Sequence, residues 1–507
     1  FFFSMRNSLG VFLALHSLYF SSNSLDLIPS SLQCKLCRTE MLAGQVGDCD
    51  CDFETVDSAT HAYFHPLLNR LQQTAYFRYF KVNLDEACPF WDDSDALCAM
   101  KDCAVETCVY EEIPLFLRFD DSESNDSSAL SKKFNGRDNP CNSVVDEEAN
   151  VDSEQSLTLG SVARVVHLLN TSMWSEGSSS DVWIDQDEAS GMVYVDLLEN
   201  PERYTGYSGP HARRVWQAIH EENCFESDFG DRGQCLEKRI FFRLISGLQA
   251  SINTHIATNY LFGGAYGEGG HWGPNTQLFV DRVGRHSDRL HNLYFTYLFL
   301  LRALAKAAPA LEASHFDTGH AEEDSRSRAL VRALVRPDHP LLDASQAAQV
   351  CQRGFDESRL FQMDSELEEG MTEFEQYMAM RRTLELRKEF QERFRNISRI
   401  MDCVGCEKCR LWGKLQVLGI GTALKILMSR EEEGEITLQR NEAIALLNTL
   451  AQLSTSVQSV QLWRQRELRS ALFLLLGRVG VVALLGIGLY VYRKRSGRAH
   501  NTHAKTN

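Results

Sequence analysis

The chain has 507 residues, enough for one large hydrophobic core or two smaller ones, and its 44% of hydrophobic residues argues against general disorder. Its net charge of −17 argues against a nucleic-acid partner, because phosphate binding requires a basic surface. The 15 cysteines are typical of an oxidising compartment, and their odd number leaves at least one thiol unpaired or shared between alternative pairings.

The first 25 residues are predicted to be a secretory signal peptide. Arg6 precedes an apolar run from Leu9 to Phe20, and small and polar residues follow that run. The alternative is a signal anchor that is never cleaved, although the run is short for a membrane span.

Cysteines dominate the next segment, residues 26–110. The first four surround a turn that contains Gly and Asp, and this pattern favours two structural disulfides over a zinc site without fixing the pairing: Cys34, Cys37, Cys49 and Cys51. Residues 76–84 alternate enough to form a strand or a short helix.

A second group of cysteines lies in polar, acidic sequence with little core-forming periodicity: Cys88, Cys98, Cys103 and Cys108. We therefore expect this stretch to be a mobile surface loop. On such a loop a Cys98–Cys103 disulfide can meet the thiol of another protein outside and then swing inward. Static disulfides among these cysteines are the alternative.

Residues 111–192 are predicted to be an acidic variable region. Asp, Glu, Ser and Asn are abundant over residues 119–160, so this part is a loop or a locally disordered insertion. Cys141 stands alone in it, and neither Cys141 nor Cys108 has an obvious permanent partner. Both are candidates for a regulatory disulfide; the alternative is that Cys141 is inert.

Residues 193–463 are predicted to form a helical core. Trp216 lies in its first helix, where the default role of a tryptophan is to pack in the core. Cys224 and Cys235 bracket a short acidic loop and are expected to pair.

The next two helices carry polar side chains. Ser246 and Gln249 are three residues apart, so they are neighbours on one helix face. Residues 289–304 read as a buried helix, and a buried arginine requires an anion, which makes Arg289 and Arg302 candidates to bind one. On an ideal helix these two point in nearly opposite directions. Arg289 is therefore expected to precede the first turn and bend back, or only one arginine reaches the ligand.

A polar, charged segment at residues 312–372, which contains Cys351, is expected to be a variable peripheral insertion. Residues 441–463 have the pattern of an amphipathic helix packed on the core. No Gly-x-Gly-x-x-Gly follows a predicted strand, so a Rossmann dinucleotide site is not indicated.

The carboxyl end is predicted to cross a membrane. Residues 471–492 are apolar apart from Arg478, and the tail 493–507 begins with a basic cluster, which favours a cytosolic tail and a lumenal main domain. The alternative is a buried C-terminal helix. Three glycosylation sequons agree with a lumenal location: Asn125, Asn170 and Asn396.

Three cysteines at Cys-x-x-Cys-x-x-Cys spacing, Cys403, Cys406 and Cys409, lie between two helical patterns, so one helix should end there and another begin. The positive end of a helix favours thiolate, and a Cys-x-x-Cys pair placed there can cycle between dithiol and disulfide. On spacing alone, zinc or iron–sulfur ligation and a structural disulfide stay open.

This cysteine triad and its surroundings closely resemble the endoplasmic reticulum oxidoreductins, the Ero family of flavin-dependent thiol oxidases that re-oxidise protein disulfide isomerase. The resemblance is carried by the run from Asn396 to Leu427 and by four shorter runs: Cys49–Asp57, Cys88–Trp91, Cys103–Val105 and Asn200–Tyr207. The gap between Cys88 and Cys98 is one residue longer than the family pattern.

The resemblance implies FAD as the cofactor, protein disulfide isomerase as the partner, and oxygen as the electron acceptor, giving hydrogen peroxide. It implies that Cys98 and Cys103 form the shuttle pair, that Cys406 and Cys409 form the inner pair, and that a structural disulfide joins Cys88 to Cys403. The flavin contacts that it implies are Arg203, Thr205, Trp216, Ser246, Gln249, Arg289 and Arg302. The family has His at the position of Gln249, which is a departure, since Gln forms hydrogen bonds but carries no charge.

We therefore predict a mainly α-helical protein of the endoplasmic reticulum membrane. It would have a single helical FAD-binding catalytic domain, a disulfide-rich N-terminal segment and a C-terminal transmembrane helix, and its electron transport would support protein folding. Two other functions stay open: a lumenal protein that binds metal through the triad, and a membrane-anchored binding protein whose disulfides are only structural.

Overall fold

The computed structural model describes residues 53–92, 103–118, 183–184, 191–202, 209–223, 235–263, 269–314, 316, 318–336, 339, 341–342, 373–429 and 436–503. In these residues the chain is mainly helical, which confirms the predicted fold class. The elements up to residue 284 are α3 (Phe53–Ala59), η2 (Thr60–Phe64), α4 (His65–Gln72), α5 (Ala75–Arg78), β1 (Tyr79–Asn83), α6 (Leu115–Arg118), β2 (Met192–Asp196), α9 (Pro210–Asn223), α10 (Cys235–Thr258), β3 (Tyr260–Phe262), β4 (His271–Gly273), α11 (Thr276–Phe279) and η6 (Val280–Gly284). The later elements are α12 (Ser287–Lys306), α13 (Ala308–Ala313), α14 (Ala321–Leu334), α17 (Glu373–Ile400), η7 (Met401–Cys403), α18 (Glu407–Met428) and α19 (Arg440–His503).

Several predicted features lie outside the described residues, and they stay predictions. They are the signal peptide, the acidic loop 119–160, the sequons Asn125 and Asn170, and the residues Cys34, Cys37, Cys49, Cys51, Cys98, Cys141, Cys224, Cys351, Arg203 and Thr205. Of the expected Cys224–Cys235 pair, the structure gives only that Cys235 is the first residue of α10.

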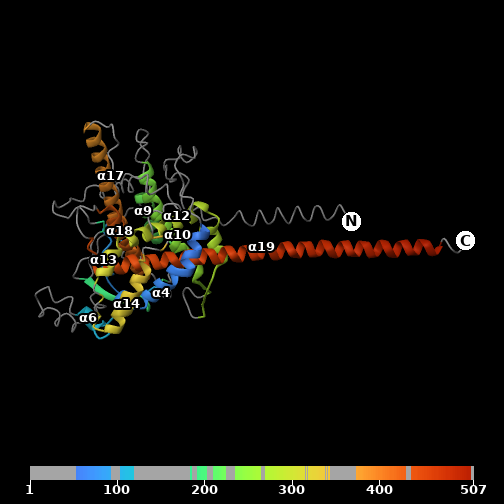
Figure 1. Ribbon diagram of the computed structural model, residues 1–507, viewed down its shortest axis with the longest axis horizontal. Coiled ribbons are helices and arrows are strands. Elements are labelled where there is room, and N and C mark those ends of the chain that lie inside the picture. Colours follow the sequence, from blue (N-terminus) through green and yellow to red (C-terminus); the bar gives the residue numbers. More distant parts are fainter. Residues whose placement is uncertain are drawn as a thin grey trace, which may run out of the picture.

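Four helices form the centre of the fold. α18 packs along α19, and α12 lies against α10, α18 and α19 (Figure 1). Two glycines allow the closest approaches. A methyl group on Gly247 of α10 would meet Asn292 and Thr296 of α12, and one on Gly419 of α18 would meet Thr449 of α19. The backbones of α10 and α12 therefore come close at Gly247, next to Ser246, and those of α18 and α19 come close at Gly419.

The N-terminal described segment joins this core instead of standing apart. Phe64 and Leu68 are completely buried, and α4 packs against α14 and α19. β1 pairs antiparallel with β2, with Tyr79 opposite Asp196. Residues 76–84, expected to be a strand or a short helix, contain the end of α5 followed by β1. A second small sheet pairs β3 with β4.

The segment 312–372 is not peripheral where the structure describes it. α14 lies inside this range and buries Leu330, Val331 and Leu334 in the main hydrophobic core. Asp324 accepts hydrogen bonds from the backbone and hydroxyl groups of Thr318, which secures the start of the helix. The charged side chains of Glu322, Arg326, Arg328 and Arg332 lie exposed on the outer face of α14.

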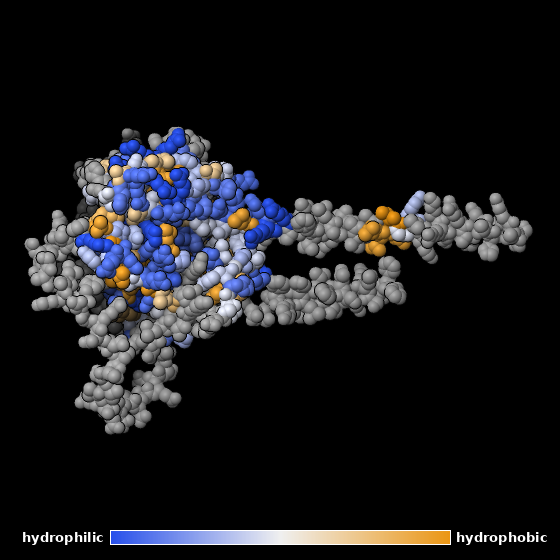
Figure 2. Space-filling view, turned by 90° about the horizontal axis from the view of Figure 1, so that it is seen from below, coloured by the Kyte–Doolittle hydropathy of each residue, from blue (hydrophilic) through white to orange (hydrophobic). Residues whose placement is uncertain are grey.

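The first part of α19, up to Trp463, packs in the core, and the rest of the helix projects from the molecule. Its first part buries the predicted amphipathic face, including Leu446, Leu450 and Val457. The helix then continues to His503, well beyond the rest of the molecule (Figure 1). On this projecting part four aliphatic side chains are exposed, Leu484, Leu485, Ile487 and Leu489, and Figure 2 shows an orange patch there. Tyr490 is exposed beside them.

Helix α17 packs against α9 through a buried carboxyl group. Glu222 of α9 accepts a hydrogen bond from the side-chain amide of Asn396, at 3.1 Å, and the Glu222 backbone carbonyl accepts one from Arg393, also at 3.1 Å. Burial raises the pKa of Glu222 to about 7, although Arg393 and Asn396 act in the opposite direction. The amide of Asn396 is thus occupied inside a helix, which makes this sequon a poor site for a glycan.

The raised pKa predicts how stability depends on pH. Between pH 4.5, the ordinary pKa of this group, and about pH 7, the folded state holds a proton on Glu222 that the unfolded state has lost, so the group lowers stability as pH rises. Glu222→Gln removes this effect. In urea unfolding, the stability of the variant relative to the natural protein should increase from pH 5 to pH 8, by at most about 3 kcal/mol.

Glu221→Gln is the matched control, because this neighbouring carboxylate contacts Gln217 on the helix surface. Its stability relative to the natural protein should change much less over the same pH range, because the charge of Glu221 is only the last of the causes that raise the pKa of Glu222. An equally small change for Glu222→Gln would contradict the assignment.

Candidate active site

The three cysteines of the triad lie where α17 ends and α18 begins, as the sequence predicts. Cys403 ends η7, and Cys406 caps the N-terminus of α18, where its sulfur accepts a hydrogen bond from the backbone N–H of Cys409 at 3.3 Å. Cys406 and Cys409 form a disulfide. Cys406 is completely buried, whereas Cys409 is half-buried. When this pair is reduced, the helix N-terminus stabilises a thiolate on Cys406.

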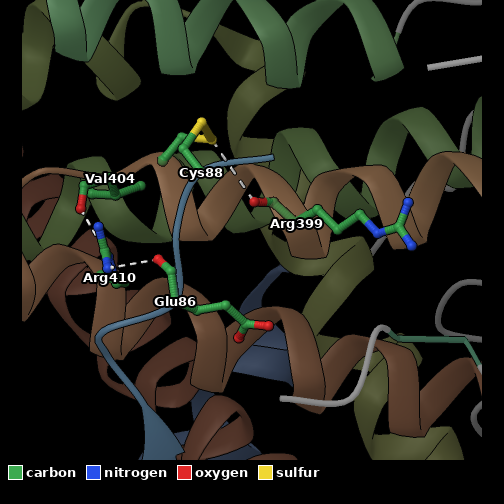
Figure 3. Close-up of a disulfide and its surroundings, with 6 residues drawn as sticks. Glu86, Cys88, Arg399, Val404 and Arg410 are labelled. Atoms are coloured by element: carbon green, nitrogen blue, oxygen red, sulfur yellow. Dashed lines mark hydrogen bonds between the residues drawn. A yellow bond between two sulfur atoms is a disulfide. The ribbon is translucent and has the colours of Figure 1, made fainter. Parts of the chain in front are cut away.

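A second disulfide fixes the triad to a distant part of the chain. Cys403 is bonded to Cys88, 315 residues away, which is the pairing that the resemblance implies (Figure 3). Arg410, the next residue after Cys409, donates to the carbonyl oxygens of Val404, at 3.0 Å, and Glu86, at 3.4 Å. This guanidinium therefore holds residues 84–88, here called the strap, against the turn that carries the three cysteines.

Residues 98–118, which begin with the predicted shuttle cysteines, are here called the shuttle segment. Its described part starts at Cys103 and contacts the first turn of α18. The backbone N–H of Lys408 donates to the carbonyl oxygen of Cys103, and the carboxylate of Glu407 accepts from the N–H of Val105, both at 2.9 Å. Cys103 is only 7% exposed, and it is in a disulfide. The start of this segment, at Cys103 and Val105, is therefore held against α18 by hydrogen bonds, whereas Val109, Tyr110 and Leu115 further along are exposed on the surface.

Asn200 joins the shuttle segment to the inner helix. Its side-chain amide forms two hydrogen bonds of 2.8 Å with the backbone of Glu106, one as donor and one as acceptor. Its backbone carbonyl oxygen accepts a third from the indole N–H of Trp412 in α18, also at 2.8 Å. Asn200 is completely buried. One residue therefore fixes the shuttle segment, α18 and the start of the Asn200–Tyr207 run relative to one another.

Cys108 is a free thiol and is half-buried. Burial raises the pKa of Cys108 to about 11, and the nearby carboxylates of Asp196 and Glu112 act in the same direction. The thiol is therefore protonated at neutral pH and is a weak nucleophile.

The described residues that the resemblance assigns to the flavin come from three helices. Trp216 is half-buried on α9, and Ser246 of α10 accepts a hydrogen bond from the side chain of Asn292 in α12 at 3.0 Å. Gln249 is exposed on α10, and Arg302 of α12 is half-buried. Arg289 lies in the first turn of α12, not before it as one expectation had it, and its guanidinium bends back to the carbonyl oxygen of Arg282.

These side chains fit a dinucleotide flavin. Polar side chains line one face of α10, and the guanidiniums of Arg282 and Arg289 have no acidic partner among the described residues, so two positive charges are open to phosphate oxygens. Trp216 supplies an aromatic face. No group of three or more potential metal ligands occurs in the described part of the chain.

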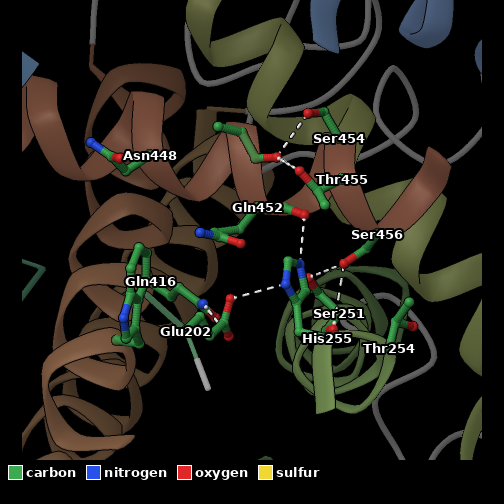
Figure 4. A network of polar contacts seen from close by, with 12 residues as sticks. Glu202, Ser251, Thr254, His255, Gln416, Asn448, Gln452, Ser454, Thr455 and Ser456 are labelled. Atoms are coloured by element: carbon green, nitrogen blue, oxygen red, sulfur yellow. Dashed lines mark hydrogen bonds and ion pairs between the residues drawn. The ribbon is translucent and has the colours of Figure 1, made fainter. Parts of the chain in front are cut away.

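Glu202 and His255 form a buried ionisable pair that the sequence did not predict (Figure 4). The Nδ1 of His255 lies 3.3 Å from a carboxylate oxygen of Glu202, and its Nε2 lies 2.9 Å from the carbonyl oxygen of Gln452. A carbonyl only accepts, so Nε2 is the donor to Gln452. Gln416 of α18 donates to the other oxygen of Glu202 at 2.9 Å. The pair connects α10, α18 and α19 to the residue just before Arg203.

Comparisons with known proteins agree with this geometry. The family model described as Endoplasmic Reticulum Oxidoreductin 1 (ERO1) matches residues 63–460. The chain is 40% identical over 435 residues to endoplasmic reticulum oxidoreductin-1 of Arabidopsis thaliana, covering 85% of this chain and 82% of the relative. It is 37% identical to ERO1-like protein alpha of Mus musculus, covering 83% of this chain and 90% of the relative.

A solved structure is also similar. It is that of Ero1p, described as the source of disulfide bonds for oxidative protein folding in the cell. The match has a TM-score of 0.53 and 27% identity, and it covers 83% of this chain and 99% of that one.

The Glu202–His255 pair yields a prediction on stability. His255→Ala should lower the free energy of unfolding by about 3 kcal/mol, because it leaves a buried carboxylate without its cationic or proton-sharing partner. Glu202→Gln combined with His255→Ala should cost clearly less than the sum of the two single changes, since the second change then removes no remaining partner. Urea unfolding followed by circular dichroism measures all three variants. Strictly additive effects would show that the two groups do not interact.

Proposed function

The chain belongs to the endoplasmic reticulum oxidoreductin (ERO1) family, and on that premise we propose that it is an FAD-dependent oxidase of protein disulfide isomerase. Membership makes it an oxidoreductase that acts as a thiol oxidase in oxidative protein folding. The identity of the protein partner, the cofactor, the order of the cysteine pairs and the product hydrogen peroxide are parts of our proposal.

One observation carries the proposal most directly. The segment that begins at Cys103 is hydrogen-bonded to the first turn of α18, the same turn that carries the Cys406–Cys409 disulfide. A shuttle cysteine and an inner pair that share one helix start can exchange disulfides without a large rearrangement of the core.

The relay consists of two thiol–disulfide exchanges. In the first, the two thiols of reduced isomerase reduce the Cys98–Cys103 disulfide, and the isomerase leaves with its own disulfide restored. In the second, the Cys98–Cys103 dithiol reduces the Cys406–Cys409 disulfide and becomes a disulfide again. The helix N-terminus at Cys406 stabilises the thiolate that this second exchange releases.

FAD, when bound, supplies the redox chemistry that takes up the electron pair and delivers it to oxygen. The residues that would hold it are Arg203, Thr205, Trp216, Ser246, Gln249, Arg289 and Arg302. Their task is to bind and orient the flavin, while the Cys88–Cys403 disulfide and Arg410 keep the inner pair in place.

A metal-binding function is a weaker alternative for the triad. Zinc and iron–sulfur clusters require thiolates, and all three triad cysteines are in disulfides here. A binding protein whose disulfides are only structural would not need Cys103 to dock beside a second disulfide.

Regulation by alternative pairing is a further part of the proposal. A bond between Cys103 and Cys108, with Cys98 bonded to Cys141, would withdraw the shuttle pair from the isomerase. The raised pKa of Cys108 keeps its thiol protonated at neutral pH, so this thiol would form the Cys103–Cys108 disulfide slowly.

We also propose that α19 anchors the protein in the endoplasmic reticulum membrane, with the catalytic domain in the lumen. The exposed apolar side chains from Leu484 to Tyr490 support this, because they would otherwise face water. Length and hydropathy single out α18 among the described residues as a possible span, but α18 is mostly buried in the core.

Cysteine variants test the relay. Cys406→Ser should purify with the absorption bands of an oxidised flavin yet consume no oxygen with reduced isomerase, because the inner pair is lost. Cys98→Ser with Cys103→Ser should also fail with isomerase but keep slow oxygen consumption with dithiothreitol, a small thiol that reaches the inner pair directly. Cys108→Ser is the control and should not lower the rate. Equal loss with both reductants would contradict a division of labour between the pairs.

Extraction tests the anchor. Alkaline carbonate should leave the intact protein in microsomal membranes and should release a form that ends at residue 470, since only the former has the span. Protease added to sealed microsomes should remove only the tail 493–507. Complete release of the intact protein would overturn the anchor and leave the catalytic proposal untouched.

A further inference from the structure

We propose that Arg282 is a second guanidinium of the flavin site and binds the phosphate groups of the dinucleotide together with Arg289. This inference rests on the proposed FAD-dependent function. Arg282 is not among the residues that the resemblance assigns to the flavin, and it lies in η6, outside every run that carries the resemblance.

Hydrogen bonds fix Arg282 to the helix face that is expected to meet the flavin. Its Nη1 donates to the side-chain oxygen of Asn253 at 3.1 Å, and the amide of Asn253 donates to the carbonyl oxygen of Gln249 at 2.9 Å. Arg289 in turn donates to the backbone carbonyl of Arg282. The two arginines therefore belong to one connected network with Gln249 on α10.

The electrostatics of this network call for an anion. Among the described residues, Arg282 and Arg289 make only hydrogen bonds to neutral oxygen atoms, whereas Arg285 in the same turn forms an ion pair with Asp281 at 3.3 Å. Both residues are exposed to solvent at their surface, while partial desolvation lowers the pKa of Arg282, and desolvation followed by the charge of Arg282 lowers the pKa of Arg289. Two adjacent positive charges that repel each other gain most from a ligand with several negative oxygens.

The proposal also accounts for Gln249. Where the resemblance leads one to expect His, this chain has a side chain that cannot carry charge. A guanidinium tied to the Gln249 carbonyl through Asn253 places a permanent positive charge on the same face of the site. Arg282 would then supply phosphate affinity that does not depend on residue 249.

Release of flavin from the holoprotein tests this directly. The natural protein, Arg282→Gln, Arg282→Lys and Arg285→Gln are each diluted into flavin-free buffer, and the rise of flavin fluorescence gives the release rate. Circular dichroism of the same samples reports folding. We expect Arg282→Gln to release FAD about tenfold faster than the natural protein, the effect of losing one charge-assisted contact to phosphate. Arg282→Lys should fall between them, and Arg285→Gln should match the natural protein.

Salt separates a phosphate contact from a structural role. Raising the ionic strength should reduce the ratio between Arg282→Gln and the natural protein, because salt screens the lost attraction. Asn253→Ala, which removes the anchor but keeps the charge, should accelerate release to a smaller extent. A release rate for Arg282→Gln equal to that of Arg285→Gln, or a ratio independent of salt, would overturn the inference. A natural protein that carries no flavin would overturn the proposed function itself, and the two failures are therefore distinguishable.

Discussion

The backbone N–H groups at the start of α18 are the constraint on which the rest of the site depends. A helix leaves its first N–H groups without partners, and here they receive the sulfur of Cys406 and the carbonyl oxygen of Cys103. The same positive helix end that holds the shuttle segment in place also stabilises the thiolate of the inner pair. One feature of secondary structure thus serves both positioning and chemistry, which explains why Cys103 and the Cys406–Cys409 disulfide, about 300 residues apart in sequence, lie at the same helix start.

Around this helix start, separate contacts hold the participating segments. The Cys88–Cys403 disulfide and Arg410 fix the strap from the N-terminal part of the chain. Asn200 connects the shuttle segment to Trp412, and two residues further along Glu202 is held by Gln416 and His255. Because Gln416 and Trp412 both belong to α18, the segment that leads to the expected flavin contacts shares its support with the inner pair. A change in the packing of α18 would therefore affect both sites.

Much of the fold could be predicted because it depends on local pattern. Helical periodicity on both sides of the triad correctly placed a helix end and a helix start, and the amphipathic face of residues 441–463 was correctly assigned to the core. Predictions failed where a single contact between residues far apart in sequence determines how a segment packs. The docking of Cys103 uses a backbone carbonyl, which leaves no trace in side-chain pattern. α14 looked peripheral since its buried face is narrow, and His255 finds Glu202 only through tertiary packing.

The most direct measurement is a search for the covalent link between the two cysteine pairs. Cys406→Ser and Cys409→Ser each leave one inner thiol that cannot complete the exchange. Non-reducing peptide mapping by mass spectrometry, after thiols are blocked, shows what that thiol is bonded to. Our account predicts that at least one variant accumulates a disulfide between the remaining inner cysteine and the peptide that contains Cys98 or Cys103. If both variants contain only free inner thiols, with the shuttle peptide never attached, the shuttle pair does not pass electrons to the inner pair and the proposed relay is wrong.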